Sequence, residues 1–177
     1  MSFANLRLEG PTEEEMRQVL AAYGFATYEA AGVELCLCQL LAIQHISPTK
    51  PHDRSDSRRE FFNRRHHNTL GRLIKAVREC VKLPTVIIEK FDQALSGRNW
   101  LIHHFYSEGF PALAHRESRN TLVCRLNEMA LWYSELSRQL ITEIDIHLAQ
   151  KGISLEKINR ETELYLSSLH SEESKWN

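Results

Sequence analysis

Apolar residues recur every three to four positions through five stretches of the chain, which is the spacing of helices that bury one face. The stretches cover residues 12–46, 58–81, 84–106, 117–150 and 154–169. An irregularity is expected at 68–71, the Gly and Pro of 107–111 should end the third helix, and Gly152 should end the fourth. The pattern therefore predicts an all-α protein, an up-and-down bundle of four to five helices, with residues 1–170 as one domain and 171–177 as a frayed tail.

The first predicted helix is apolar on nearly every side. Thr12 and Glu15 have the spacing of a capping box at its start. From residue 19 to residue 46 the only formal charges are Glu29 and Glu34. These glutamates, with two tyrosines, two glutamines and a histidine, argue against a membrane span. We therefore expect this helix at the centre of the bundle or at a subunit interface, and we expect no membrane partner.

Composition narrows the class of protein further. A chain of 177 residues is long enough for one domain with its own core. Seven Gly and five Pro are few for an all-β protein, which needs frequent turns. The net charge of -1 gives no overall attraction to nucleic acid, so any such binding must depend on local patches. The four cysteines form neither a CxxC pair nor a zinc-type spacing, and no leader segment is recognisable. We expect free thiols, no metal, no other cofactor and a cytoplasmic location.

The third predicted helix carries the clearest candidate site. At about 100° per residue, Arg98 lies at the centre of an apolar stripe that includes Ile102. A lone guanidinium there is costly, so Arg98 should meet a carboxylate, a cleft or a partner chain. We expect Glu29, which also lies on an apolar stripe, to be that carboxylate. Asn99 and His103 are four positions apart and share a neighbouring face, so the site is predicted to combine them with Arg98.

Residues 98–105 (RNWLIHHF) resemble the signature of the HEPN superfamily, in which Arg is followed after four to six residues by His and often directly by Asn. The resemblance implies a bundle of four to five helices and a metal-independent endoribonuclease of toxin–antitoxin or phage-defence type. A cognate antitoxin protein is a partner that it implies. One subgroup has Tyr two positions after the His. Phe105 stands there, which argues against regulation by tyrosine modification.

The residue types of this motif suit RNA cleavage. His103 can take a proton from a ribose 2'-OH or give one to the leaving 5'-oxygen. The Arg98 fork can hold the phosphate, and Asn99 can orient the imidazole or bind a phosphate oxygen. One copy supplies one motif histidine, so we expect a homodimer with a composite site, while His104 is expected to contact a partner or solvent. The alternatives are a catalytically silent module that binds nucleotide or RNA, and a helical scaffold that binds another protein.

A second candidate surface follows from local charge. Residues 54–78 contain seven Arg and one Lys against Asp56 and Glu60. Such an excess is typical of a surface that binds a polyanion, although an ordinary solvated helix face has the same composition. The residues predicted to contact RNA here are Arg58, Arg59, Arg64, Arg65 and Arg72.

Overall fold

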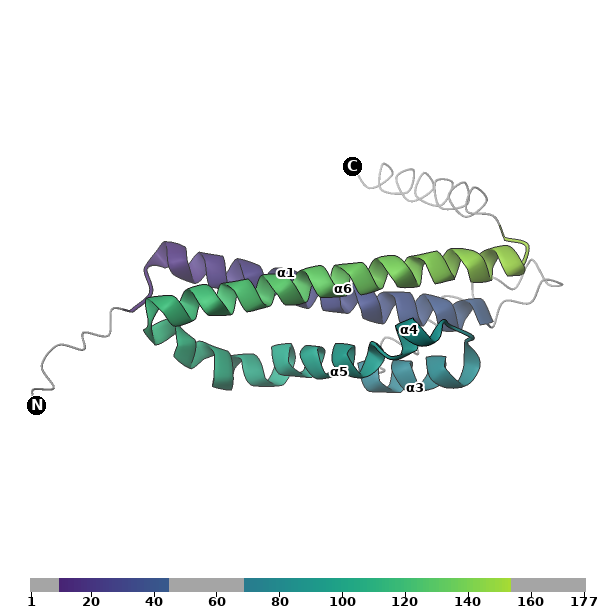
Figure 1. Cartoon of the computed structure of the whole chain (residues 1–177), viewed down its shortest axis with the longest axis horizontal. Helices are drawn as coiled ribbons and strands as arrows, with labels where there is room; N and C mark the ends of the chain where they lie inside the picture. Colours follow the sequence, from purple (N-terminus) through teal and green to yellow (C-terminus); the bar gives the residue numbers. More distant parts are fainter. Residues whose placement is uncertain (1–9, 45–68, 154–177) are drawn as a thin grey trace, which may run out of the picture.

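The structure is a computed structural model that describes residues 10–44 and 69–153. All regular secondary structure in these residues is helical, which confirms the predicted all-α class (Figure 1). The elements are α1 (Glu13–Gln44), α3 (Leu70–Cys80), α4 (Thr85–Ile88), α5 (Phe91–Asn99), the π-helix η2 (Trp100–Gly109), the 3-10 helix η3 (Phe110–Ala114) and α6 (Arg116–Gln150). The predicted helix at 154–169, the tail at 171–177 and the part of the second helix before residue 69 lie outside the described residues.

The two long helices α1 and α6 lie side by side and run in the same direction (Figure 1). The first and fourth helices of an up-and-down bundle would run in opposite directions, so this part of the predicted fold is wrong for the described helices. Glu15 contacts Arg119 near their N-termini, and Gln44 contacts His147 near their C-termini. The buried positions of α1 recur every three to four residues: Val19, Ala22, Ala26, Ala30, Val33, Leu37 and Leu40. The alanines among them let α6 approach closely, as ridge-into-groove packing requires.

The remaining elements return along this pair. α5 and η2 run opposite to α1 and α6 (Figure 1), and α3 packs antiparallel to α5. Arg78 of α3 forms an ion pair with Asp92 of α5 at 3.0 Å. Tyr23 of α1 stacks on Phe105 of η2, with ring centroids 4.1 Å apart. The contact of Tyr23 with Phe105 places the segment of the candidate motif against the N-terminal half of α1.

The predicted ends of the third and fourth helices are both confirmed. α6 ends as expected, because Gly152 has φ +68° and its N–H donates to the carbonyl of Ala149 over 2.9 Å. The third predicted helix also ends within 107–111, because η2 ends at Gly109 and the short 3-10 helix η3 follows it to Ala114. Gly109 gives room to the Phe105 ring, and Pro111 lies in the first turn of η3, where a missing N–H costs little.

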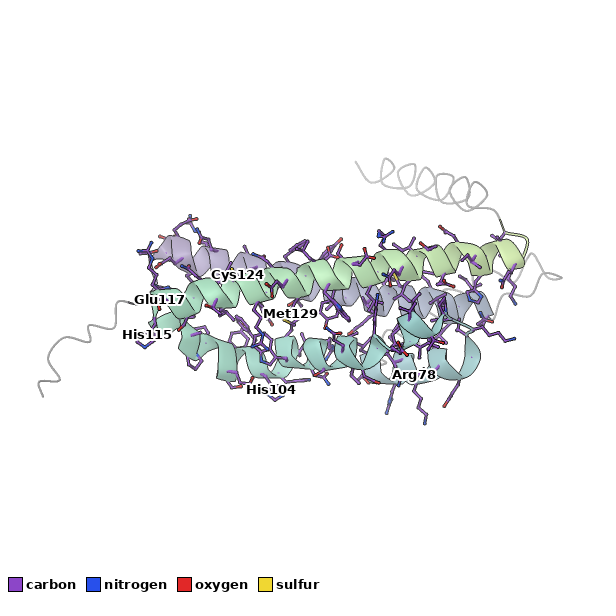
Figure 2. All side chains as sticks on the ribbon, viewed as in Figure 1. Arg78, His104, His115, Glu117, Cys124 and Met129 are labelled. Carbon is purple, nitrogen blue, oxygen red and sulfur yellow. The ribbon has the colours of Figure 1, made fainter. Side chains whose placement is uncertain are left out.

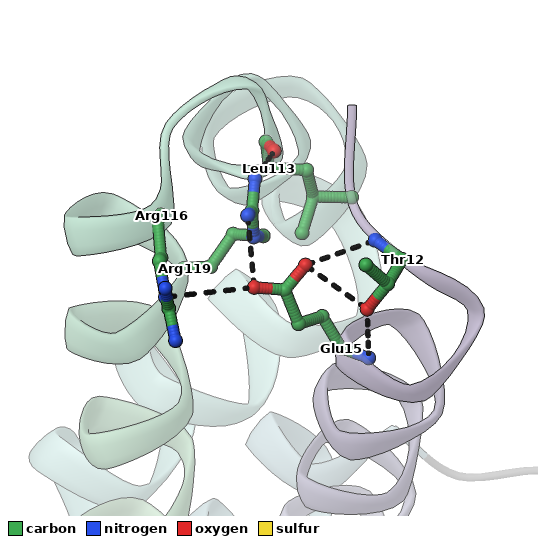
Figure 3. A network of polar contacts seen from close by, with 5 residues as sticks. All are labelled: Thr12, Glu15, Leu113, Arg116 and Arg119. Carbon is green, nitrogen blue, oxygen red and sulfur yellow. Dashed lines mark hydrogen bonds and ion pairs between the residues drawn. The ribbon is translucent and has the colours of Figure 1, made fainter. Parts of the chain in front are cut away.

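The capping box predicted at Thr12 and Glu15 is present and does more than cap α1 (Figure 3). The N–H of Thr12 donates to the Glu15 carboxylate over 2.9 Å, and the N–H of Glu15 donates to the Thr12 hydroxyl over 3.2 Å. The same carboxylate binds the buried guanidinium of Arg119 at 3.0 Å, which in turn donates to the Leu113 carbonyl over 2.7 Å. The Thr12 backbone and then Arg119 lower the pKa of Glu15 to about 2. One carboxylate therefore ties the start of α1 to η3 and α6.

By length and composition α1 is apolar enough to cross a membrane, and 56% of its most apolar window is buried inside the bundle. A central bundle helix has the same composition, as expected from the sequence. Other positions of α1 leave large apolar side chains exposed, among them Tyr28 and Leu35. Cys36 and Cys38 are both buried. The helix is thus a core element on one side and an uncovered apolar surface on the other.

Candidate functional site

Arg98 lies in the last turn of α5 and reaches toward α1. Its Nε donates to Oε1 of Glu34 over 3.0 Å, and the two side chains are 24% and 28% exposed. Among the described residues the guanidinium makes no other hydrogen bond, so both terminal amino groups are available to a ligand. The side chain lines a hollow of about 100 Å³ between α1 and the α5–η2 segment, together with Thr27, Ala30, Ala31, Glu34, Leu101 and Ile102. One water needs roughly 10–15 Å³ of such space, so the hollow has room for a group of phosphate size.

The prediction that Glu29 pairs with Arg98 is wrong, because Glu34 takes that place. The two glutamates are five positions apart, which separates their directions on α1 by about 140°. Glu34 faces α5, whereas Glu29 lines a groove between α1 and α6. The need for a carboxylate beside Arg98 was correctly inferred, but the face of α1 that supplies this carboxylate was not.

Tyr133 of α6 holds the backbone from which Arg98 projects. Its ring is 1% exposed, and its hydroxyl donates to the carbonyl of Ala94 over 2.7 Å. Gly97 makes this approach possible, since a Cβ at that position would lie 2.5 Å from the hydroxyl oxygen. Burial raises the pKa of Tyr133 well above its usual range, so the phenol stays neutral and remains a donor. The hydrogen bond from Tyr133 therefore fixes the last turn of α5 on the side that faces α6.

Asn99 follows Arg98 directly at the end of α5, and His103 lies in the first half of η2. Asn99 is half-buried and His103 is exposed. Neither side chain has a hydrogen-bond partner in the described part of the chain. Because α5 ends at Asn99 and a π-helix begins at Trp100, the regular wheel used above does not hold beyond Asn99. Ile102 does lie beside Arg98, but it is 40% exposed, so the stripe around Arg98 is open to solvent.

The π-helix η2 distinguishes this segment from the rest of the bundle. Its buried residues are Leu101, Phe105 and Gly109, four positions apart in each case. Residues four apart drift by about 40° in an α-helix, and the wider turn of a π-helix brings them closer into line. Tyr23 supports it by donating a hydrogen bond to the Leu101 carbonyl over 3.2 Å. π-Helical turns are rare and occur frequently at functional sites, which draws attention to His103 and His104.

A cluster that the sequence did not single out lies on the α6 side of η2. The indole N–H of Trp100 donates to Oε2 of Glu108 over 2.7 Å, and Nδ1 of His104 lies 3.4 Å from Oε1 of the same carboxylate. Arg125 of α6 stacks on Trp100, with its guanidinium carbon 4.0 Å from the ring centroid. The spacing of residues 100, 104 and 108 is the only sign of this cluster in the sequence, and it has meaning only once the π-helix is known.

Of the five arginines predicted to contact RNA, called here the RNA-binding strip, one lies in the described part of the chain. Arg72 is exposed on α3, whereas Arg58, Arg59, Arg64 and Arg65 lie outside the described residues. In the described residues no group of three or more His, Cys, Asp or Glu side chains is placed to hold a metal ion. The strip stays a prediction.

Fold and site together define a helical-bundle protein with an Arg–Glu pair, a surface histidine and a carboxylate–histidine contact around one π-helix. Comparison with family models, with curated proteins and with solved structures finds no match to this chain.

Proposed function

We propose that this protein is a metal-independent endoribonuclease of the kind found in toxin–antitoxin or phage-defence systems, with Arg98, Asn99 and His103 at its site. The observation that carries the proposal is the state of Arg98. Its Nε is held by Glu34, its terminal amino groups are unoccupied among the described residues, and it lines a hollow of phosphate size. A guanidinium oriented in this way presents a fork of donors to two phosphate oxygens.

The chemistry requires two proton transfers at one phosphate. The ribose 2'-oxygen attacks phosphorus as its proton leaves to a base, and the bond from phosphorus to the 5'-oxygen breaks as an acid protonates that oxygen. The products are a 2',3'-cyclic phosphate and a 5'-hydroxyl. Arg98 stabilises the charge on the phosphate oxygens, and the exposed His103 exchanges one of the two protons. The HEPN-like bundle and the composite homodimer expected from the sequence belong to this proposal.

The test is cleavage of mixed cellular RNA by purified protein in EDTA. We expect wild type to leave 2',3'-cyclic phosphate ends. We expect His103→Asn to lose about 10²- to 10⁴-fold in rate, the usual contribution of general acid–base catalysis. His115→Asn is the matched control, because His115 is also exposed but lies at the start of α6, remote from the motif. Equal loss in both variants, or no loss in either, would contradict the assignment of His103.

The second candidate is RNA or nucleotide binding without cleavage. It is favoured by Glu34, because its negative charge beside Arg98 offsets the stabilisation that Arg98 can give to the charge that develops on the phosphate during cleavage. On this reading wild type binds labelled RNA without cutting it. Glu34→Gln then tightens binding, while Arg98→Gln weakens it. Fluorescence anisotropy at two salt concentrations measures both effects, because a lost phosphate contact reduces the salt dependence.

A further inference from the structure

Three large apolar side chains are exposed at every fourth position after Arg98. Ile102 and Tyr106 of η2 are 40% and 61% exposed, and Phe110 at the start of η3 is 46% exposed. A single exposed apolar side chain is ordinary, but several that adjoin one another are typical of a surface that binds a partner. We call Ile102, Tyr106 and Phe110 the aromatic row.

The contacts of the aromatic row place it on the side of η2 that faces α1, the side of the Arg98 hollow. Ile102 lines that hollow together with Thr27 of α1. Four positions further along η2, the Tyr106 ring meets the ring of Tyr23 of α1 edge-on, with centroids 6.2 Å apart. Tyr23 lies one turn before Thr27, which donates to the Tyr23 carbonyl over 2.8 Å. The row therefore begins at the hollow and continues beside α1 toward its N-terminus.

The Tyr106 ring is supported by other rings and still leaves most of its surface open. Phe105 and Tyr23 both meet it edge-on, and these two rings stack on each other below it. The Phe110 ring lies beyond it, with centroids 6.1 Å apart and planes 39° from parallel. Exposed aromatic rings held in this way provide faces on which bases stack.

We propose that Tyr106 and Phe110 stack on unpaired bases close to the phosphate that Arg98 binds, so that the site takes single-stranded RNA and rejects duplex RNA. This inference rests on the proposed ribonuclease function. Tyr106 follows Arg98 by eight positions, which is about 12 Å along a helix. A stacked strand rises about 3.4 Å per nucleotide, so Tyr106 meets a base about two to four nucleotides from that phosphate. Bases of an RNA duplex are paired and stacked on one another, so they do not reach the rings.

The other occupant that suits exposed aromatic side chains is a second copy of the chain. Two observations favour RNA. The row begins at a guanidinium whose terminal amino groups have no partner in the described part of the chain, and a phosphate is the group that such a fork binds. The row also lies outside the groove between α1 and α6, whose exposed apolar side chains are available to a second copy. A cation next to aromatic rings is typical of surfaces that bind single strands.

The first experiment measures binding apart from cleavage. The probe is labelled single-stranded RNA with every 2'-hydroxyl methylated, because this RNA lacks the nucleophile that cleavage needs. We expect Tyr106→Leu to weaken its binding about fivefold or more in fluorescence anisotropy, since leucine keeps apolar bulk and loses the stacking face. Tyr106→Trp keeps that face and should bind about as tightly as wild type. Wild-type affinity in Tyr106→Leu would overturn the inference.

Val86→Ala is the matched control, because Val86 is 58% exposed, close to the exposure of Tyr106. Its helix α4 lies toward the end of the bundle that holds Arg78, whereas η2 extends toward the end that holds His115 (Figure 2). This variant should bind RNA as wild type does. Circular dichroism checks that all variants are folded. Equal weakening in the control and in Tyr106→Leu would show a general effect of lost apolar surface and would count against stacking.

The second experiment compares cleavage of one RNA alone and annealed to its complement, in EDTA. We expect wild type to cut the single strand at least about tenfold faster than the duplex. On the single strand we expect Tyr106→Leu to raise KM with kcat nearly unchanged, because stacking at a distance from the reacting phosphate binds the substrate and the transition state alike. Equal rates on both substrates would overturn the inference.

Sedimentation of the same variants tests the other occupant. We expect Tyr106→Leu and Phe110→Leu to keep the oligomeric state of wild type. A change of that state would show that the aromatic row contacts a second copy, and the inference would then be wrong.

Failure of this inference is distinct from failure of the proposed function. Cleavage that depends on His103 and has the same KM in wild type and Tyr106→Leu overturns the role of the aromatic row alone. Binding that depends on Tyr106, without any cleavage by wild type in EDTA, overturns the ribonuclease proposal and supports single-strand binding by the row.

Discussion

The close approach of Tyr133 to Gly97 should make the effect of Gly97→Ala on stability depend on the residue at position 133. We expect Gly97→Ala to destabilise the wild type and to stabilise the Tyr133→Phe variant. In a helix interior Gly97→Ala would by itself stabilise the fold by about 1 kcal/mol, because alanine loses less backbone entropy than glycine. Here the new Cβ would lie 2.5 Å from the Tyr133 hydroxyl, which is buried and bonded to Ala94. Overpacking of a core site typically costs about 1–3 kcal/mol. We therefore expect a net loss of about 1 kcal/mol in wild type.

Removal of the hydroxyl reverses the outcome. Tyr133→Phe alone should cost about 1 kcal/mol, since it removes one buried hydrogen bond. It also removes the atom that the new Cβ would meet, and the next contacts of that Cβ, to Met129 and to the ring of residue 133, are at 3.4 Å. In the Tyr133→Phe background we therefore expect Gly97→Ala to stabilise by about 0.5–1 kcal/mol.

A double-mutant cycle measured by urea unfolding tests this expectation. Far-UV circular dichroism follows the unfolding of wild type, both single variants and the double variant under identical conditions. The coupling between the two substitutions should be about 1–3 kcal/mol. If Gly97→Ala has the same effect on stability in both backgrounds, the hydroxyl does not restrict this position and the argument for a fixed α5 end is wrong.

Three further outcomes are expected. The pKa of Glu15 in the folded state, about 2, lies below its ordinary value, so its contribution to stability is complete above about pH 4.5 and is lost as pH falls toward 2. Urea midpoints at pH 7 and pH 3 should therefore differ less in Glu15→Gln than in wild type, and an equal difference would contradict this. Leu35→Glu and Leu131→Glu place charge in the groove between α1 and α6, whose exposed apolar side chains are available to the predicted homodimer; sedimentation should show monomers, and unchanged dimers would place the interface elsewhere. Arg98→Lys keeps the charge but loses the fork, and should lower RNA cleavage by about tenfold or more without changing the melting temperature; full activity would remove Arg98 from the reaction.

Helix ends with local signals were predictable from the sequence. The capping box at Thr12 and the stop at Gly152 each depend on a few neighbouring residues, and both are confirmed. The Gly and Pro signals at 107–111 also mark an element boundary, the change from η2 to η3 at Gly109, but they did not reveal the 3-10 helix that follows it. Such residues predict where a helix ends and do not predict which type of turn comes next.

The sequence indicated which residues form the candidate site, but it did not indicate which side chains contact them. Arg98 needed a carboxylate on physical grounds, but whether Glu29 or Glu34 supplied it depended on which face of α1 meets α5. That choice is made by tertiary packing and cannot be read from one helix. The contact from Trp100 to Glu108 was hidden for a similar reason, since it spans eight positions of a helix type that the sequence pattern does not reveal.

The parallel course of α1 and α6 gives the bundle an electrical polarity. The dipoles of the two longest helices add instead of cancelling, with their positive ends near Thr12 and His115 and their negative ends near Gln44 and Gln150. The first end carries acidic side chains, including Glu13, Glu14, Glu15 and Glu117. These carboxylates therefore lie where the positive ends of both helices stabilise their charge, and the same acidic groups at the other end would be destabilised.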